Sequence, residues 1–403
     1  MVPKGWKLTS LREVCSGNLQ TGPFGSQLHA HEYVQTGIPV LMPKDLIDCR
    51  ADLISAAKIT QDKADSLVKH LLKDGDLLFS RRGDVSRFAL IDSDSEGTLC
   101  GTGCLKARPN SQHSSKFLAY FIQKESVKKW LEQNAVGQTM PNMNTEILGE
   151  LPLIAASSKE EEEKIAQILS TWDKAITTTE QLLANSQQQK KALMQQLLTG
   201  KKRLLDTNGG RFSGEWKWLK ASELFKTVSR KNNSETEELL AVTQDQGVLP
   251  RSMLERRVVM PDGSTQGYKL VVPGNFIISL RSFQGGLEYS NYRGLVSPAY
   301  TVLEPIRTIN DEFYKQYYKS YDFIGHLAVA VIGIRDGKQI SYSDFSFLKL
   351  PYPGLEEQQK IAAVLSAADQ EIAALQQKLD KLKQEKKALM QQLLTGKRRV
   401  TVN

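Results

Sequence analysis

Three arginines flank a glycine turn in the first third of the chain and could bind an anion. Arg81 and Arg82 directly follow residues 76–80 (DLLFS), whose apolar run predicts a short buried strand. Arg87 lies a few residues further on, past Gly83. Guanidinium groups donate paired hydrogen bonds to phosphate oxygens and to guanine edges. Arg81, Arg82 and Arg87 are therefore candidates for contacting phosphates or base edges of a nucleic acid.

Two further segments of the first half could contact nucleic acid. Loop 21–26 (TGPFGS) contains glycines, whose lack of a side chain allows a close approach to a backbone, and Ser26 of this loop is a candidate contact. Residues 138–144 (QTMPNMN) cluster amide side chains, which are suited to bidentate contacts with adenine. Gln138 and Asn142 are the candidates in that cluster.

In the second half, cationic and aromatic residues interleave near Gly285-Gly286. Arg281, Tyr289 and Arg293 are the candidate DNA-binding residues there. Each has a simpler interpretation, because exposed arginines usually form weak solvated ion pairs and a tyrosine can serve only to pack a core.

No motif of a catalytic site is found in the sequence. Gly200, Gly337 and Gly396 each precede a lysine, but no Ser or Thr follows as a phosphate-binding loop requires. A dinucleotide fingerprint, a nucleophile elbow and an Asn/Asp-Pro-Pro-aromatic tetrad are also absent from the sequence. We therefore expect a non-catalytic protein, a diverged active site being the alternative.

The cysteines and histidines do not predict a metal site. Cys100 and Cys104 could form half of one, but no second Cys/His pair follows at ligand spacing, and the five histidines are scattered. Buried free thiols are the better interpretation, in keeping with a reducing compartment. The sequence predicts neither metal nor cofactor.

The beginning of the chain, MVPKGWKLTSL, lacks the apolar stretch of a secretory leader. No run of 18 or more apolar residues occurs, so no membrane association is expected and the predicted location is cytoplasmic. At 403 residues and 40% hydrophobic content, the chain should fold into two or three domains with sizeable cores. A net charge of +8 points only weakly to a polyanionic partner.

An internal repeat determines the organisation of the chain. Residues 190–200 and 386–396 both read KKALMQQLLTG, and each is followed by a basic tripeptide. The similarity extends upstream at the same offset, where Asp173 matches Asp369. The segments LPLI and LPYP precede the two repeated stretches. The chain is therefore predicted to contain two copies of a globular unit followed by a long helix.

Both predicted helices carry apolar residues at alternating steps of four and three, which is the pattern of a coiled coil. A lysine occurs at the same step of each, Lys190 and Lys386, and a polar residue there costs stability but can fix the register. The simplest prediction is that the helices pair with each other as an antiparallel coiled coil with a pseudo-two-fold axis, the alternative being that each packs only on its own domain. The predicted pairing residues are Ile165, Leu169, Trp172, Ile176, Leu183, Leu193, Leu197, Ile361, Leu365, Ile372, Leu379, Leu389 and Leu393.

The predicted fold class is mixed α+β, with two α/β globular domains separated by the two helices. We predict strands over 76–80, 88–91, 268–272, 275–280 and 299–303, and helices over 116–133 and 311–318. The predicted boundaries are 1–157 for the first globular domain, 158–203 for the first helix, 204–350 for a linker with the second globular domain, and 351–403 for the second helix with its basic tail. Residues 75–82 (GDLLFSRR) align with 274–281 (GNFIISLR), whereas the globular units otherwise diverge.

These features resemble the specificity subunit of a type I restriction–modification enzyme. The resemblance covers essentially the whole chain and is carried by the twin KKALMQQLLTG segments, the helix starts EEEEKIAQIL and EEQQKIAAVL, the strand motifs GDLLFSRRG and GNFIISLRS, and the pairs Trp6-Lys7 and Trp216-Lys217.

The resemblance implies a DNA-binding subunit without catalysis of its own. Each target recognition domain would read one half of an asymmetric, interrupted site in double-stranded DNA, and the helices would set the gap. Two methyltransferase subunits would dock on this scaffold, joined by restriction subunits in the cleaving complex. Two alternatives remain: a coiled-coil scaffold that joins proteins without contacting DNA, and a fragment of a fused restriction–methylation enzyme.

Overall fold

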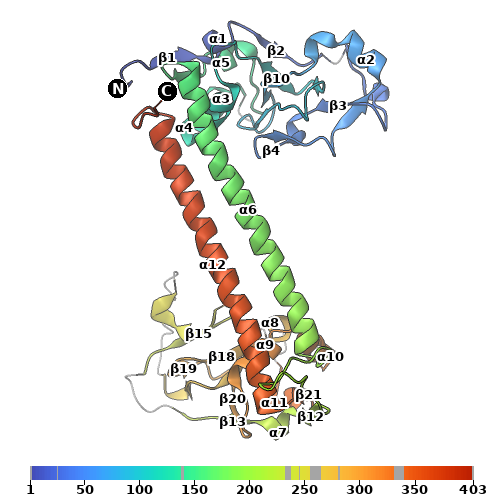
Figure 1. Cartoon of the computed structure of the whole chain (residues 1–403), viewed down its shortest axis with the longest axis vertical. Helices are drawn as coiled ribbons and strands as arrows, with labels where there is room; N and C mark the ends of the chain where they lie inside the picture. The colour runs from blue at the N-terminus through green and yellow to red at the C-terminus, as the bar shows by residue number, and fades with distance from the viewer. Residues whose placement is uncertain are drawn as a thin grey trace. The chain divides into compact units, whose positions relative to one another are not determined.

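The structure is a computed structural model of the 403-residue chain, and it describes residues 2–24, 26–137, 140–231, 237–244, 246–254, 265–279, 282–330 and 340–401. The chain divides into two compact units. The first combines Met1–Thr179 with Lys378–Asn403, and the second spans Glu180–Gln377. Each unit contains one end of each of two long helices, and we call the remainder of each unit its head (Figure 1).

The long helices are α6 (Lys159–Leu197) and α12 (Leu355–Leu393), each of 39 residues. Helix α6 has Glu160, Glu161 and Glu162 in its first turn, where carboxylates interact favourably with the helix dipole. Helix α12 has two glutamates at the equivalent place. The repeated sequence thus forms two helices of the same length.

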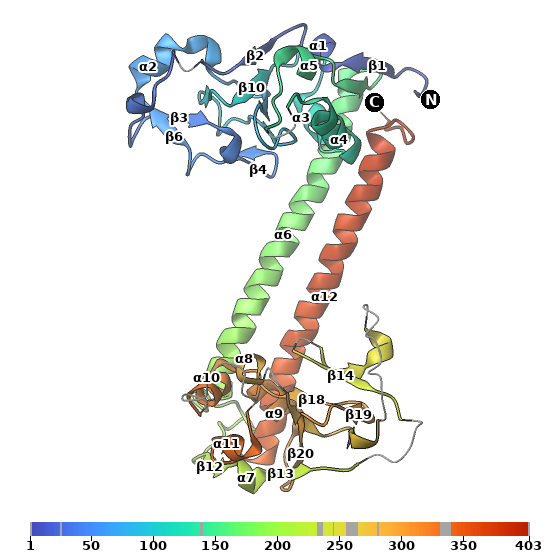
Figure 2. The ribbon, with the colours of Figure 1, turned by 180° about the vertical axis from the view of Figure 1, so that it is seen from behind.

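In the first unit, the beginning of α6 packs against the end of α12. Ile165 and Leu169 are fully buried in one core with Leu394 and with Leu393, which is 2% exposed. The second unit makes the reverse contact, between the end of α6 and the beginning of α12. The helices therefore run antiparallel within each unit (Figure 2), which confirms the predicted arrangement.

All predicted pairing positions are buried or half-buried, and most of the positions between them are exposed. The fully or nearly fully buried ones lie toward the helix ends, where the heads also cover them. Trp172 and Ile176 of α6, and Ile372 and Leu389 of α12, are half-buried. This burial pattern is that of an apolar stripe facing a partner helix.

The first head is built on a four-stranded antiparallel sheet in the order β2-β10-β7-β8, with a three-stranded sheet β6-β3-β9 beside it and a two-stranded sheet β1-β11 next to α6. Its strands are β1 (Lys7–Ser10), β2 (Leu19–Thr21), β3 (Ile38–Leu41), β4 (Leu46–Ile47), β5 (Arg50–Ala51), β6 (Ala57–Ile59), β7 (Leu77–Ser80), β8 (Phe88–Leu90), β9 (Leu99–Cys100), β10 (Cys104–Ala107) and β11 (Pro152–Ala155). Its helices are α1 (Leu11–Val14), α2 (Gln61–Ser66), α3 (Ser115–Ile122), α4 (Glu125–Asn134) and α5 (Thr145–Gly149).

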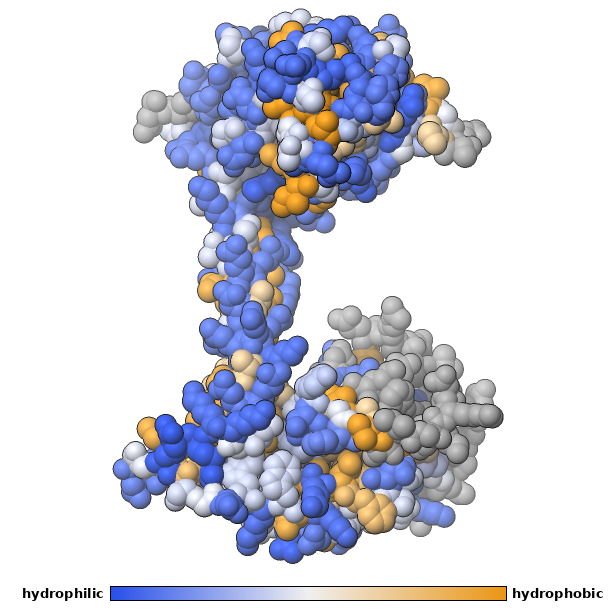
Figure 3. Space-filling model, turned by 90° about the vertical axis from the view of Figure 1, so that its right-hand side faces the viewer, coloured by the Kyte–Doolittle hydropathy of each residue, from blue (hydrophilic) through white to orange (hydrophobic). Residues whose placement is uncertain are grey.

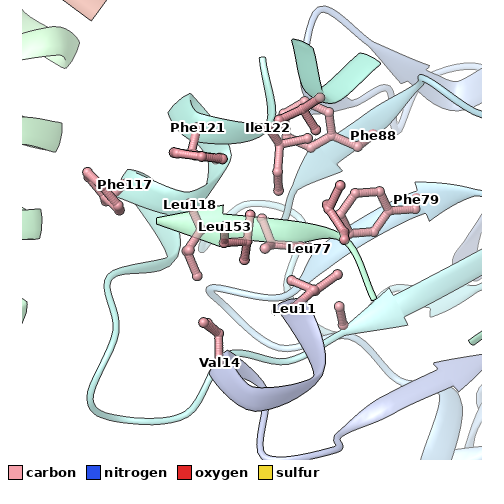
Figure 4. Packing of buried hydrophobic residues seen from close by; sticks show 14 of the residues in the cluster. Leu11, Val14, Leu77, Phe79, Phe88, Phe117, Leu118, Phe121, Ile122 and Leu153 are labelled. Atoms are coloured by element: carbon pink, nitrogen blue, oxygen red, sulfur yellow. The ribbon is translucent and has the colours of Figure 1, made fainter. Parts of the chain in front are cut away.

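Helix α3 supplies much of the core of the first head. Phe117, Phe121 and Ile122 point from α3 into a cluster formed with the sheet residues Leu77 and Phe79 (Figure 4). Ser114 caps this helix by accepting a hydrogen bond from the Phe117 N–H. The cap and the apolar face together fix α3 on the sheet.

The second head contains a four-stranded antiparallel sheet in the order β13-β20-β17-β18, with two-stranded sheets β12-β21, β14-β15 and β16-β19. Its strands are β12 (Lys217–Lys220), β13 (Phe225–Val228), β14 (Leu240–Thr243), β15 (Gly247–Pro250), β16 (Lys269–Val271), β17 (Phe276–Ile278), β18 (Glu288–Tyr289), β19 (Gly294–Val296), β20 (Thr301–Pro305) and β21 (Lys349–Tyr352). Its helices are α7 (Ala221–Leu224), α8 (Ser282–Gly285), α9 (Asp311–Tyr317), α10 (Tyr321–Ala330) and α11 (Tyr342–Ser346).

Each head contains its own central four-stranded sheet, and the two sheets have the same strand order although the sequences of the heads diverge. Strand β7 of the first head and β17 of the second are the segments aligned through GDLLFSRR and GNFIISLR, and each occupies the third position of its sheet. The second core is more aromatic, with Phe225, Phe276 and Tyr318 in mutual contact at ring centroid distances of 5.2–5.9 Å. Different side chains therefore fill the same framework.

One predicted element is wrong in its extent. The expected helix over 116–133 is two helices, α3 and α4, because Lys124 takes an extended conformation between them (φ −62°, ψ 138°). The turn lets Val127 and Leu131 of α4 reach the core separately from α3. Tertiary packing decides this break, since no glycine or proline marks it in the sequence.

The repeated basic tails close the helix ends instead of extending into solvent. Arg399 donates from Nε and Nη2 to the two carboxylate oxygens of Glu161, at 2.6 and 2.9 Å. Arg203 makes the equivalent fork with Glu357, at 2.5 and 2.8 Å. Each arginine thus binds the first turn of the opposite helix through a bidentate ion pair.

The structure explains why each repeated segment ends in glycine. Gly200 and Gly396 take left-handed conformations, with φ of +70° and +67°, and a Cβ on them would lie 3.2 Å from Trp216 and 3.0 Å from Trp6 respectively. Only glycine adopts this conformation readily, and it commonly ends helices.

Gly200→Ala and Gly396→Ala should each destabilise their unit by about 1–2 kcal/mol, because alanine is strained in the left-handed region. The midpoint of urea unfolding, followed by tryptophan fluorescence, measures this effect. Gly325→Ala in α10 is the control: it has no neighbouring atom within 4 Å and should be neutral or stabilising. Equal midpoints for all three variants would contradict the explanation.

Candidate nucleic-acid interface

The end of β7 and the loop 140–144 lie together in the first head. Arg81 donates its backbone N–H to the Gly103 carbonyl at 2.8 Å, and its own carbonyl accepts from the Met143 N–H at 2.8 Å. Arg82 pairs with Asn142 as an isolated antiparallel bridge. The structure therefore unites two segments that the sequence analysis identified independently.

Polar atoms at this junction lack internal partners. Arg81 Nε and Asn142 Oδ1 are buried and have no hydrogen-bond partner within the described part of the chain. Arg82 is exposed. A guanidinium beside an amide is suited to phosphate and base contacts, and unpaired buried polar atoms are costly unless a ligand completes them. Gln138, predicted in the same loop, lies outside the described residues.

Arg87 is engaged within its own turn. Its Nε donates to Asp84 Oδ2 at 3.1 Å, and Asp84 also accepts a hydrogen bond of 2.6 Å from the Ser86 hydroxyl. That hydroxyl contributes most to lowering the pKa of Asp84, so the carboxylate stays charged. The pair is about half exposed, so Arg87 still reaches solvent but carries a neutralising partner.

Loop 21–26 has a packing constraint at one end and an exposed aromatic residue at the other. A Cβ on Gly22 would lie 1.8 Å from the Gly101 carbonyl oxygen, so Gly22 is needed for contact with the neighbouring chain segment. Ser26 is exposed, and Phe24 is 61% exposed. Phe24 was missed in the sequence analysis, although an aromatic residue in a glycine-rich loop is a usable signal for base stacking. Gly25 lies outside the described residues.

The second head presents fewer free candidates. The Tyr289 ring lies 5.0 Å from that of Phe276, and its hydroxyl donates to Asp311 Oδ2 at 3.1 Å. Burial is the main cause that raises the pKa of Tyr289 to about 12. Arg293 is 57% exposed in its side chain and pairs with Glu237 at 2.9 Å. Arg281, aligned with Arg82, lies outside the described residues.

The cysteines are not arranged for chemistry. All four are free, and Cys15, Cys100 and Cys104 are buried. Burial raises the pKa of Cys15 and of Cys100 to about 12, which keeps both thiols protonated. Among the described residues, no group of three or more His, Cys, Asp or Glu is placed to hold a metal ion. In the same part of the chain, no helix is long and apolar enough to cross a membrane.

The first unit also contains an open apolar groove of about 450 Å³. It lies between α6 and α12, and its lining residues are Lys164, Ile168, Trp172, Leu389, Leu393, Arg398, Arg399, Val400 and Thr401. Apolar patches also interrupt the hydrophilic surface of each head (Figure 3). An apolar groove with a basic rim is suited to a protein partner.

Each unit combines antiparallel ends of the two long helices with a head, and the two heads have the same order of strands in their central sheets. Comparisons with known proteins identify the class of protein that has this fold. The model of the type I restriction modification DNA specificity domain matches residues 3–185 and again residues 213–384. The chain belongs to this family of type I specificity subunits.

Individual relatives are similar to this chain over nearly its full length. The chain is 25% identical over 421 aligned residues to the putative type I restriction enzyme MjaX specificity subunit of Methanocaldococcus jannaschii, which covers 99% of this chain and 95% of the relative. Among solved structures, it is similar to the S subunit from M. genitalium (TM-score 0.59, 14% identity, 100% and 97% coverage). It is also similar to the HsdS subunit from Thermoanaerobacter tengcongensis (TM-score 0.53, 20% identity, 98% of each chain).

If Arg82 contacts a DNA phosphate, Arg82→Ala should weaken DNA binding and lower the salt dependence of the binding constant by about one unit in the log–log slope. Arg87→Ala, whose guanidinium is already paired with Asp84, should have the smaller effect. Fluorescence anisotropy with a duplex across salt concentrations measures both. An equal or larger loss for Arg87→Ala would contradict this ranking.

Proposed function

We propose that this chain is the non-catalytic, DNA-reading subunit of a type I restriction–modification complex and that it recognises a bipartite, asymmetric site. Each head reads one half of the site, and the paired helices set the number of unread base pairs between the halves. The recognition domains correspond to residues 1–157 and to 211–350 within the 204–350 segment, and the spacer helices lie within 158–203 and 351–403.

The observation that carries the proposal is the contrast between the helices and the heads. The helix ends repeat contact for contact, as in the Arg399–Glu161 and Arg203–Glu357 forks. The heads keep one sheet order but differ in their surfaces and cores. A repeated support with unlike heads is what reading two different half-sites requires.

The length of the helices is suited to spacing half-sites on DNA. A helix of 39 residues is ~58 Å long at 1.5 Å per residue. One turn of B-DNA measures about 34–36 Å. Paired helices of this length can serve half-sites that lie more than one turn apart.

The catalytic steps belong to partner subunits in this proposal. Two methyltransferase subunits would modify adenines at the site, and restriction subunits would join them for cleavage. The apolar groove around Trp172 and Leu389 supports docking of such a subunit, because its half-buried seam residues remain accessible. The supporting evidence for this division of labour is membership of the specificity family.

The test is to map modified adenines in host DNA with the gene present and deleted, together with binding of the purified chain and its methyltransferase partner to the mapped site. A bipartite motif that disappears on deletion supports the proposal. An unchanged modification pattern together with no salt-dependent DNA binding would instead favour a protein-joining scaffold.

Lengthening both helices should lengthen the gap. Seven extra residues in the middle of each of α6 and α12 add ~10 Å and preserve the heptad pattern. The mapped gap should grow by about three base pairs, at ~3.4 Å per base pair, while both half-sites stay the same. An unaltered gap in the methylation map would contradict the spacer role of the helices.

Exchanging one recognition domain should change one half of the site. Replacing residues 211–350 with the corresponding segment of another specificity subunit leaves the first head and both helices intact. The methylation map should then show a new second half-site and the original first half-site. Loss of both halves in a folded chimera would show that the heads do not read independently.

A further inference from the structure

A polar cluster joins three elements within the first unit. Asp173 of α6 accepts a hydrogen bond from the Tyr120 hydroxyl of α3 at 2.6 Å and is ion-paired with Lys386 of α12. The Lys386 ammonium also lies 5.5 Å from the centroid of the Tyr120 ring. We call Tyr120, Asp173 and Lys386 the first clamp.

An equivalent cluster occurs within the second unit. Asp369 of α12 accepts from the Lys190 ammonium of α6 at 2.5 Å and from the Gln316 amide of α9 at 2.7 Å. Gln316, Asp369 and Lys190 form the second clamp. In both clamps the carboxylate connects its own head to a lysine on the other long helix.

The clamps belong to one antiparallel register. Asp173 and Lys190 are 17 positions apart on α6, and Asp369 and Lys386 are the same distance apart on α12. Within each unit, sliding one long helix by a turn against the other would separate the clamp lysine from its carboxylate. A charged group moved into an apolar seam is costly unless it is paired, so the clamps disfavour other registers.

Each head is also attached to its own helix at a second point. In the first unit, Glu162 accepts from the Ser114 N–H at 2.7 Å, at the cap of α3. In the second unit, Gln358 accepts from the Asn310 N–H at 2.9 Å, at the cap of α9. Two points of attachment on one rigid helix prevent rotation of the head about either of them.

The clamps differ from ordinary surface ion pairs. The lysine side chains are only 16% and 20% exposed, and each carboxylate also binds a head residue. By contrast, the Lys381–Glu385 pair on α12 connects residues of a single helix at 3.9 Å, with 73% of the lysine side chain exposed. Pairs of the latter kind contribute little.

We infer that Asp173 and Asp369 are positioning residues for DNA recognition, each fixing the orientation of its head and the helix register in one contact. This inference rests on the proposed function. It assigns to the clamps the ability of the complex to tell the correct gap from one that is a base pair longer or shorter.

The test uses the full chain in complex with its methyltransferase partner and duplexes that carry the mapped site with its native gap or with one base pair added or removed. Tyr120→Phe removes only the hydroxyl that joins the head to Asp173. Affinity for the native gap should change little, while discrimination against the altered gaps should fall about fivefold, the equivalent of one lost hydrogen bond. Gln316→Leu should act likewise through the second clamp.

Lys386→Met removes the cross-helix half of the first clamp and should reduce discrimination at least as much. Lys381→Met, the same chemical change at an exposed position of the same helix, is the matched control and should leave discrimination intact. If Lys386→Met fails to fold, Tyr120→Phe still decides the question, because it keeps the ring and the ion pair. Wild-type discrimination in all folded clamp variants would overturn the inference alone. A wild-type complex without any bipartite preference would overturn the proposed function and this inference together.

Discussion

The structure depends on the burial of one apolar stripe along each of two long helices. Exposing either apolar stripe to water is unfavourable. In each unit the stripe of α6 is covered by that of α12. Removing a large seam side chain such as Leu169 or Leu365 would cost about 2–5 kcal/mol, a sizeable part of the stability of a typical domain. The heads are folded onto the same helices, so their placement depends on this pairing.

Duplication and divergence leave different physical marks on the chain. Contacts that hold a helix end, such as the arginine forks and the tryptophans beside Gly200 and Gly396, recur with nearly the same geometry in both units. The heads keep the same order of strands in their central sheets, but side chains within them make different contacts. The first head places Arg82 and Asn142 together at its surface, whereas the second uses Tyr289 to pack its core. The contacts at the helix ends are thus the same in both units, whereas the heads make different contacts.

Periodic features were predictable from the sequence, and contacts between distant segments were not. The heptad pattern predicted both long helices and their pairing, and the aligned motifs predicted strands β7 and β17. The break between α3 and α4 was missed because it comes from packing around Val127, not from a local signal. The proximity of Arg82 and Asn142 could not be derived either, since 60 residues separate them. Lys190 and Lys386 were identified as seam lysines, but their carboxylate partners appear only in three dimensions.

The composition of the first unit has a consequence for synthesis on the ribosome. That unit needs residues 378–403, whereas the second unit is complete once residue 377 has emerged. At a translation rate of about 5–20 residues per second, Leu169 and Trp172 are synthesised roughly 10–40 seconds before the segment that covers them. The part of the protein translated first is therefore the last to complete its core, and until then the apolar stripe of α6 lacks the α12 side chains that cover it.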